Sequence, residues 1–156
     1  MNNLAVTYSA QNKFDKAEEL QVKVMEQYTT KYGLNHPDTI LSMDNLGFTY
    51  LRDQGRLKEA EELQVKVVEL SKVMFGVNHP DTLKSMQNLA TTYREQGRLD
   101  EAEKLQGYVA EERMAKFGEK HPDTLKSMKD GMGEHHPIAL EYNKHLNELQ
   151  VQLKSN

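Results

Sequence analysis

The chain has 156 residues, the size of one ordinary domain. It contains no cysteine, which excludes disulfide frameworks, cysteine-ligated zinc and thiol catalysis. Charged residues make up 28% of the sequence and the mean hydropathy is −0.78, so we expect neither a membrane span nor an apolar signal segment. The net charge of −4 argues against a dedicated nucleic-acid or anionic-membrane binder, and we expect a cytoplasmic protein.

All four prolines follow a histidine, and a glycine stands three residues before each of these histidines. Three of the openings continue as His-Pro-Asp-Thr, at His36, His79 and His121, with spacings of 43 and 42 residues. The fourth, at His136, comes only 15 residues after His121. A sequence period of this length predicts an array of structural repeats.

The first repeat, residues 1–35, begins inside a helix. Its segment MNNLAVTY aligns with MDNLGFTY from Met43 and MQNLATTY from Met86, so the His-Pro-Asp-Thr opening is missing. We expect an excerpt of a longer array, or a reading frame that begins at an internal methionine. Asn12 stands where the third repeat has Gly97 between its two helices. Asparagine is the residue after glycine that best tolerates a left-handed turn, so a turn is expected here too.

The second and third repeats, residues 36–78 and 79–120, each contain two segments whose apolar residues step by three and four. Examples are residues 43–50 and 60–70. This spacing predicts two amphipathic helices per repeat, and the alternation of a β-strand is absent. A proline at the first helical position, an aspartate in the first turn and a glycine after the preceding helix agree with these boundaries.

The end of the chain departs from the period. A truncated repeat, residues 121–133, breaks off at the fourth opening. The terminal segment, residues 136–154, starts like a first helix and ends like a second one, and its apolar residues form one seam. We expect this helix to cap the open end of the array. A seam that does not fold back is expected to drive homodimerisation or swapping instead.

The recurring residues resemble the tetratricopeptide repeat. The resemblance lies in the leucine and small residue of the first helix, the tyrosine three residues later and the alanine of the second helix: Leu46-Gly47, Leu89-Ala90, Tyr50, Tyr93, Ala60 and Ala102. The 42-residue period is similar to that of the kinesin-light-chain type. The resemblance implies an all-α, right-handed solenoid of antiparallel helix pairs, forming one domain over residues 1–156. It also implies binding of proteins or peptides.

Repeated histidines raise the question of a metal site. His36, His79 and His121 lie one repeat apart and cannot share an ion, so we expect a structural role at the helix start. The four histidines from His121 to His145 lie closer together, but they lack the spacing of a metal-binding motif. We therefore expect no metal.

Catalysis finds no support in the other polar residues. The serines lie in helical periodicity without a nucleophile elbow, and no glycine-rich loop could cradle a phosphate. Paired carboxylates such as Glu18-Glu19 and Glu61-Glu62 have lysines at helical spacing, so we interpret them as solvated helix surface. We expect neither enzyme activity nor a cofactor.

A binding groove is the remaining candidate. In tetratricopeptide arrays the first helices line the concave face, so the resemblance places the residues beside the core leucines in the groove. The expected binding residues are one amide per repeat with nearby basic and aromatic side chains: Asn3, Asn45, Asn88, Phe48, Arg52, Lys84, Arg94 and Lys126. An asparagine amide can donate to a peptide carbonyl and accept from a peptide N–H, so the ladder suits an extended backbone.

The expected partner is a protein or an extended peptide with acidic and apolar residues, because Lys84, Arg94 and Lys126 make part of the groove basic. Two alternatives remain. Asn45 and Asn88 could instead bridge adjacent first helices and bind nothing. The whole chain could be a structural scaffold element that associates with itself through the open ends of the array.

Overall fold

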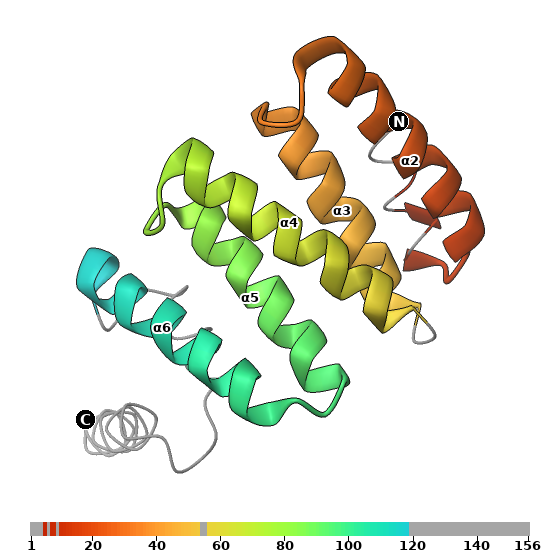
Figure 1. Cartoon of the computed structure of the whole chain (residues 1–156). Helices are drawn as coiled ribbons and strands as arrows, with labels where there is room; N and C mark the ends of the chain where they lie inside the picture. Colours follow the sequence, from red (N-terminus) through yellow and green to blue (C-terminus); the bar gives the residue numbers. More distant parts are fainter. Residues whose placement is uncertain (1–4, 6, 9, 54–55, 119–156) are drawn as a thin grey trace, which may run out of the picture. The chain divides into compact units, whose positions relative to one another are not determined.

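The computed structural model describes residues 5, 7–8, 10–53 and 56–118 of the chain. This part of the chain is helical and contains no strand. The helices, drawn in Figure 1, are α2 (Phe14–Tyr32), α3 (Pro37–Arg52), α4 (Leu57–Phe75), α5 (Pro80–Glu95) and α6 (Leu99–Phe117). Ahead of α2, Ala5, Thr7, Tyr8 and Ala10 are also helical. The predicted all-α class is confirmed.

The chain divides into two compact units, Met1–Arg98 and Leu99–Asn156. The first unit contains α2 to α5, and each of these helices packs against the next one along the chain. α3 also contacts α5. Figure 1 shows α3, α4 and α5 side by side, running in alternating directions, as the predicted antiparallel helix pairs require. The single domain predicted for residues 1–156 stays a prediction.

Several predicted features lie outside the described residues. They are the truncated repeat 121–133, the capping helix 136–154, the group of histidines from His121 to His145, and the binding residues Asn3 and Lys126.

The proline and the histidine of the repeated opening have different structural roles at the start of α3 and α5. The prolines begin the helices, as predicted, and the preceding histidine caps them. Nδ1 of His79 accepts a hydrogen bond from the backbone N–H of Asp81 at 3.3 Å, and His36 caps α3 in the same way at 3.2 Å. An imidazole nitrogen can accept only when it carries no proton, so the cap requires Nδ1 unprotonated.

The openings are also tied to the helices that precede them. The hydroxyl of Thr82 donates to the carbonyl oxygen of Gly76 at 2.8 Å, and the ring of His79 stacks on Phe75 with a centroid distance of 5.0 Å. The previous repeat has the same two contacts, in which Thr39 bonds Gly33 and His36 stacks on Tyr32. These contacts make the Gly-x-x-His-Pro-Asp-Thr segment a helix junction in both repeats, which agrees with the structural role expected for His36 and His79.

Positive φ angles end the helices where the sequence predicts them. Gly33 and Gly76 follow α2 and α4 with φ of 87° and 95° and ψ of 169° and 158°. This region is essentially restricted to glycine. Asn12 has φ of 57°, and it is the one residue other than glycine with a positive φ in the described part of the chain. The turn predicted at Asn12 is therefore confirmed.

Apolar and amide side chains together fill the space between the helices. Ile40, Met43 and Val67 form the centre of the core between α3 and α4. Ala60 is fully buried, as a close helix contact requires. Gln64 of α4 is 1% exposed and lies against Gly47 of α3, where an added Cβ would stand 3.1 Å from its Cγ. The small residue of the repeat motif thus makes room for a buried glutamine.

Candidate functional site

The predicted binding residues that the structure describes lie on two neighbouring first helices. Asn45, Phe48 and Arg52 come from α3, whereas Lys84, Asn88 and Arg94 come from α5. Contact between α3 and α5 brings the two groups into one region of the first unit. The structure therefore supplies the surface on which a groove could be built.

Asn88 bridges the two helices through Asp44. Its Nδ2 donates to both carboxylate oxygens of Asp44, at 3.0 Å and 3.2 Å. Asn45 is half-buried, and its backbone oxygen accepts a hydrogen bond from the buried Gln21 of α2 at 3.2 Å. The bridging contact named as an alternative is thus observed for Asn88, while peptide binding by the asparagine ladder stays a prediction.

Asp44 is a polar residue of this region that the sequence analysis did not single out. Only 8% of it is exposed. Burial raises the pKa of its carboxyl, and the hydrogen bond from Asn88 and the charge of Lys84 oppose that rise, while Asp81 adds to it. The sequence does contain a signal for Asp44. It is acidic, whereas the corresponding residues of the neighbouring repeats, Asn2 and Gln87, are neutral amides.

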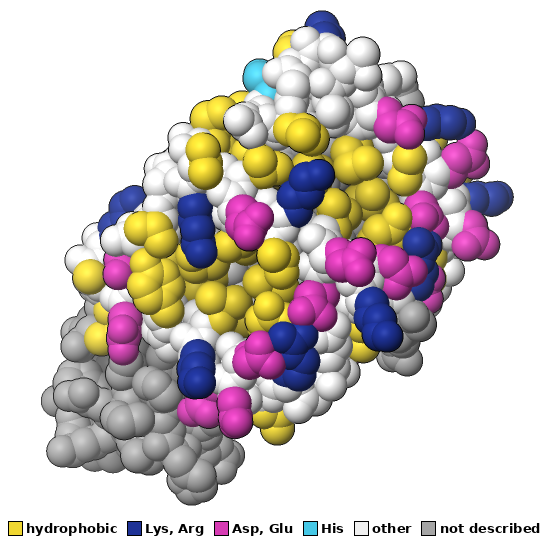
Figure 2. Space-filling model, in the orientation of Figure 1, with side chains coloured by type: hydrophobic (Ala, Val, Ile, Leu, Met, Phe, Trp, Pro, Cys, Tyr) yellow, Lys and Arg dark blue, Asp and Glu magenta, His cyan; other side chains and the backbone are white. Residues whose placement is uncertain are grey.

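Apolar side chains flank Asp44 on the surface of α3. Leu41 is 47% exposed and Phe48 is 46% exposed, and their spacing of two helical turns puts them on the same face. Leu51, in contrast, is buried and belongs to the packing. Figure 2 shows, on the face seen there, apolar side chains in patches separated by both basic and acidic side chains. The face seen there thus presents exposed apolar contacts beside charges of either sign.

Two of the carboxylates assigned to solvated surface instead tie successive repeats together. Glu18 accepts hydrogen bonds from the hydroxyl of Tyr50 at 2.9 Å and from Arg56 at 2.5 Å. Glu61 is bound in the same manner by Arg98 and Gln96. The hydrogen bond from Arg56 is the main cause that holds the pKa of Glu18 below its usual value. The surface interpretation was therefore wrong for these two residues.

Glu19 is the contrasting case. It is exposed and pairs with Lys23 four residues later on the same helix, as the sequence analysis expected. Sequence reasoning missed the ties of its neighbour Glu18 because the arginine partner lies 38 residues away.

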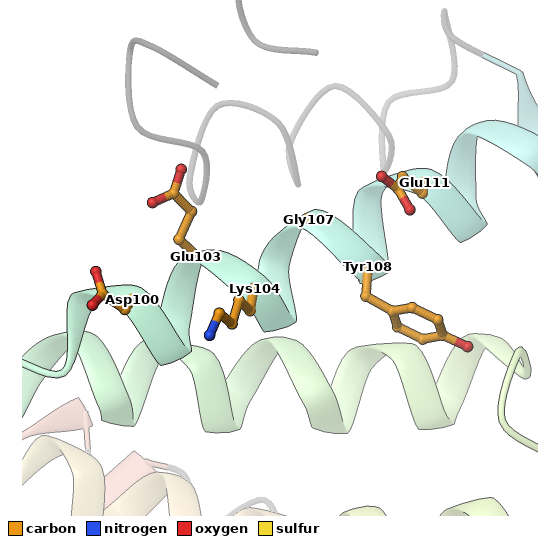
Figure 3. A pocket seen from close by; sticks show the side chains of 6 residues that line it. All are labelled: Asp100, Glu103, Lys104, Gly107, Tyr108 and Glu111. Carbon is orange, nitrogen blue, oxygen red and sulfur yellow. The ribbon is translucent and has the colours of Figure 1, made fainter. Parts of the chain in front are cut away.

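The second unit contributes one helix to the described structure. Six residues of α6, Asp100, Glu103, Lys104, Gly107, Tyr108 and Glu111, line an open hollow, and Figure 3 shows their positions along the helix. Within the described ranges, no three histidine, aspartate or glutamate side chains are placed to hold a metal ion. Nor is any helix in those ranges long and apolar enough to cross a membrane.

Comparison with known proteins decides the family. The family model described as Tetratricopeptide repeat matches residues 1–72 and 49–107. The chain belongs to the tetratricopeptide repeat family. Repeats of this family generally mediate protein–protein interactions. No curated protein matches the sequence.

Solved structures show the same tetratricopeptide fold. A candidate kinesin light chain of Podosopora anserina with nearly identical TPR-like repeats is 27% identical, with a TM-score of 0.76, over 83% of this chain and 61% of that one. A variant of the Podosopora anserina protein is 22% identical, with a TM-score of 0.75, over 99% and 90% of the two chains. BtubC (BKLC) from P. vanneervenii is 15% identical, with a TM-score of 0.77, over 99% and 63%. The chain spans about three fifths of the length of the first of these proteins. The three matches confirm the predicted resemblance to the kinesin-light-chain type of repeat.

Proposed function

We propose that the chain is a non-enzymatic interaction module that binds an extended peptide, or an extended segment of a partner protein, along α3 and α5. The observation that carries the proposal is the exposure of Phe48, since nearly half of this aromatic side chain faces solvent on a first helix. Aromatic side chains are enriched among the residues that dominate binding energy at protein interfaces. Leu41 extends the apolar contact along the same helix face.

Charged residues beside this apolar face favour a peptide with acidic and apolar residues. Arg52, Lys84 and Arg94 are exposed on α3 and α5. Exposed basic side chains attract an acidic segment and contribute more to the association rate and to specificity than to affinity. The apolar contacts at Phe48 and Leu41 would then supply most of the affinity.

The asparagines would bind the peptide backbone in this proposal. The side-chain amide of the half-buried Asn45 can bond a peptide backbone without breaking the hydrogen bond from Gln21, which goes to the backbone oxygen of Asn45. Asn88 donates to Asp44, so a peptide that uses the same N–H groups must replace that hydrogen bond. In this proposal, binding therefore depends more on Asn45 and Phe48 than on Asn88.

The test is a peptide selection followed by single substitutions. A peptide selected from a library of short linear sequences is expected to bind the parent chain in calorimetry. Asn45→Ala and Phe48→Ala should each weaken that binding about tenfold or more, as loss of a central contact does. Lys58→Ala, an exposed substitution on α4, serves as the matched control and should bind like the parent.

Circular dichroism must show the same helix content for all three variants. Selected peptides that bind Asn45→Ala and Phe48→Ala as tightly as the parent would refute the groove.

Self-association is the second candidate function, and a separate observation favours it. Val73 is 78% exposed at the end of α4, and Met74 and Val77 beside it are 41% and 45% exposed. Adjacent exposed apolar residues of this kind are typical of association surfaces. Sedimentation velocity over a wide range of concentrations is the test, and a monomer mass at every concentration would exclude this function.

A further inference from the structure

A small pocket opens between the N-terminal ends of α3 and α5 and the C-terminal end of α4. Its volume is about 170 Å³, and all of its lining residues belong to the first unit. Ile40 and Leu41 of α3 and Phe75 of α4 form its apolar wall. Leu41 is exposed whereas Ile40 is buried, so the apolar wall runs from the surface inward.

One hydroxyl group of the pocket lacks a hydrogen-bonding partner. Ser71 of α4 is 1% exposed, and its Oγ, which is buried, has no partner. A buried hydroxyl without a partner destabilises the folded chain. A ligand that carries an N–H donor would provide one, because a serine oxygen accepts hydrogen bonds.

The charges around the pocket are predominantly negative. Asp38 and Asp81 are exposed, Asp44 is buried, and Lys84 is the cation among the lining residues. The formal charge of these four side chains is therefore negative, with three carboxylates against one amine. Asp44 is 8% exposed, and burial raises the pKa of its carboxyl even though Asn88 and Lys84 oppose that rise. Burial therefore outweighs these two contacts in setting the pKa of Asp44, and a further cation beside the carboxyl would favour its charged form.

We propose that this pocket binds a lysine or arginine side chain of the partner peptide. The aliphatic part of such a side chain would pack against Ile40, Leu41 and Phe75, as long basic side chains do on apolar surfaces. Its N–H donors would face Asp44 and Ser71. The inference rests on the proposed function for the source of the side chain, and it adds a basic residue to a ligand described so far as acidic and apolar.

The first experiment uses free small molecules, so that it does not depend on peptide binding. n-Butylammonium chloride carries an aliphatic chain and a cationic head, while sodium butyrate and n-butanol supply an anionic and a neutral counterpart. Titration into the isotope-labelled chain is followed through the amide signals of Ile40, Leu41 and Ser71. We expect n-butylammonium to shift these signals saturably, and we expect butyrate and n-butanol not to do so. Equal responses to all three compounds, or no saturable response, would overturn the proposal.

Substitutions then test the electrostatic part. Asp81→Asn should weaken n-butylammonium binding about threefold, and Lys84→Gln should strengthen it about threefold, as expected for a unit charge at about 6 Å in a water-like medium. Ser71→Ala removes the buried acceptor and should weaken binding too. Glu62→Gln, an exposed substitution on α4, is the matched control and should leave the affinity unchanged. A Lys84→Gln variant that binds more weakly than the parent contradicts a cation site.

The two proposals can fail separately. If selected peptides bind but n-butylammonium does not, the cation pocket is refuted and the groove stands. If n-butylammonium binds as expected but no peptide does, the groove is refuted, and with it the peptide as the source of the cation. A last measurement joins the two proposals. Replacing a lysine of the selected peptide by norleucine should weaken peptide binding to the parent chain by a larger factor than it weakens binding to the Asp81→Asn variant.

Discussion

Gly33 and Gly76 illustrate how strictly single residues define the repeat boundary. Their combination of positive φ and extended ψ belongs to a region that side chains with a Cβ almost never adopt. Asn12 also has a positive φ, of 57°, which asparagine tolerates better than other residues with a side chain. The backbone therefore requires glycine ahead of the openings of α3 and α5, whereas the turn inside the first repeat accepts a second residue type.

Gly76→Ala is expected to lower the free energy of unfolding by about 1–3 kcal/mol. An added Cβ would meet no atom within 4 Å, so the loss comes from backbone strain and not from crowding. Urea denaturation measures it, with Val77→Ala, the exposed neighbour, as the control. A Gly76→Ala variant as stable as the control would mean that the backbone there is not held at a positive φ.

Residues with local conformational demands are those that the sequence predicts well. Proline, glycine and asparagine report on their own backbone, so Asn12 and the starts of α3 and α5 could be predicted without a structure. The burial of Asp44 could not, because it depends on how closely α3 and α5 approach each other. The hydrogen bond from Asn88 to Asp44 depends on the same distance.

At the scale of helices, the histidine cap is the feature that most distinguishes α3 and α5. Serine, threonine, aspartate and asparagine are the usual residues at this position. His36 and His79 supply the same hydrogen-bond acceptor through Nδ1, and they add a ring that stacks on the aromatic residue ending the preceding helix. One side chain thus begins one helix and contacts the end of another.

His79→Ala should destabilise the chain by about 1 kcal/mol more than His79→Asn. Both substitutions remove the ring that stacks on Phe75, but asparagine keeps an acceptor for the N–H of Asp81. The difference between the two variants therefore isolates the cap. Thermal denaturation followed by circular dichroism measures it, and equal melting temperatures would show that the cap contributes nothing to stability.

At the scale of the whole first unit, a repeated set of side chains links each second helix to the repeat that follows. Arg56 lies over the ring of Tyr50 and bonds Glu18, and Arg98 lies over Tyr93 and bonds Glu61. The sequence shows these residues recurring, but it does not show that they meet. Their separations of 37 and 38 residues exceed the reach of any pattern within one helix.

Glu18→Gln is expected to lower the free energy of unfolding by up to about 1 kcal/mol at neutral pH. The pKa of Glu18 is lower in the folded chain than its ordinary value of 4.5. Its contribution is therefore complete above that ordinary value and is lost as the pH falls through the lowered folded-state pKa. Denaturation at neutral and acidic pH measures the difference, with Glu26→Gln, exposed on the same helix, as the control. A difference that grows on acidification would contradict the sign.

Packing of each helix against the next one along the chain has a kinetic consequence for the first unit. The contacts from α2 through α5 join segments that lie close in sequence, so only short loops must close before a contact forms. Chains dominated by such local contacts fold quickly. In linear arrays of this kind, folding can start at any junction and spread to its neighbours. A folding nucleus at the Gly76–His79 junction would therefore recruit α4 and α5 first, and α3 and α2 in turn.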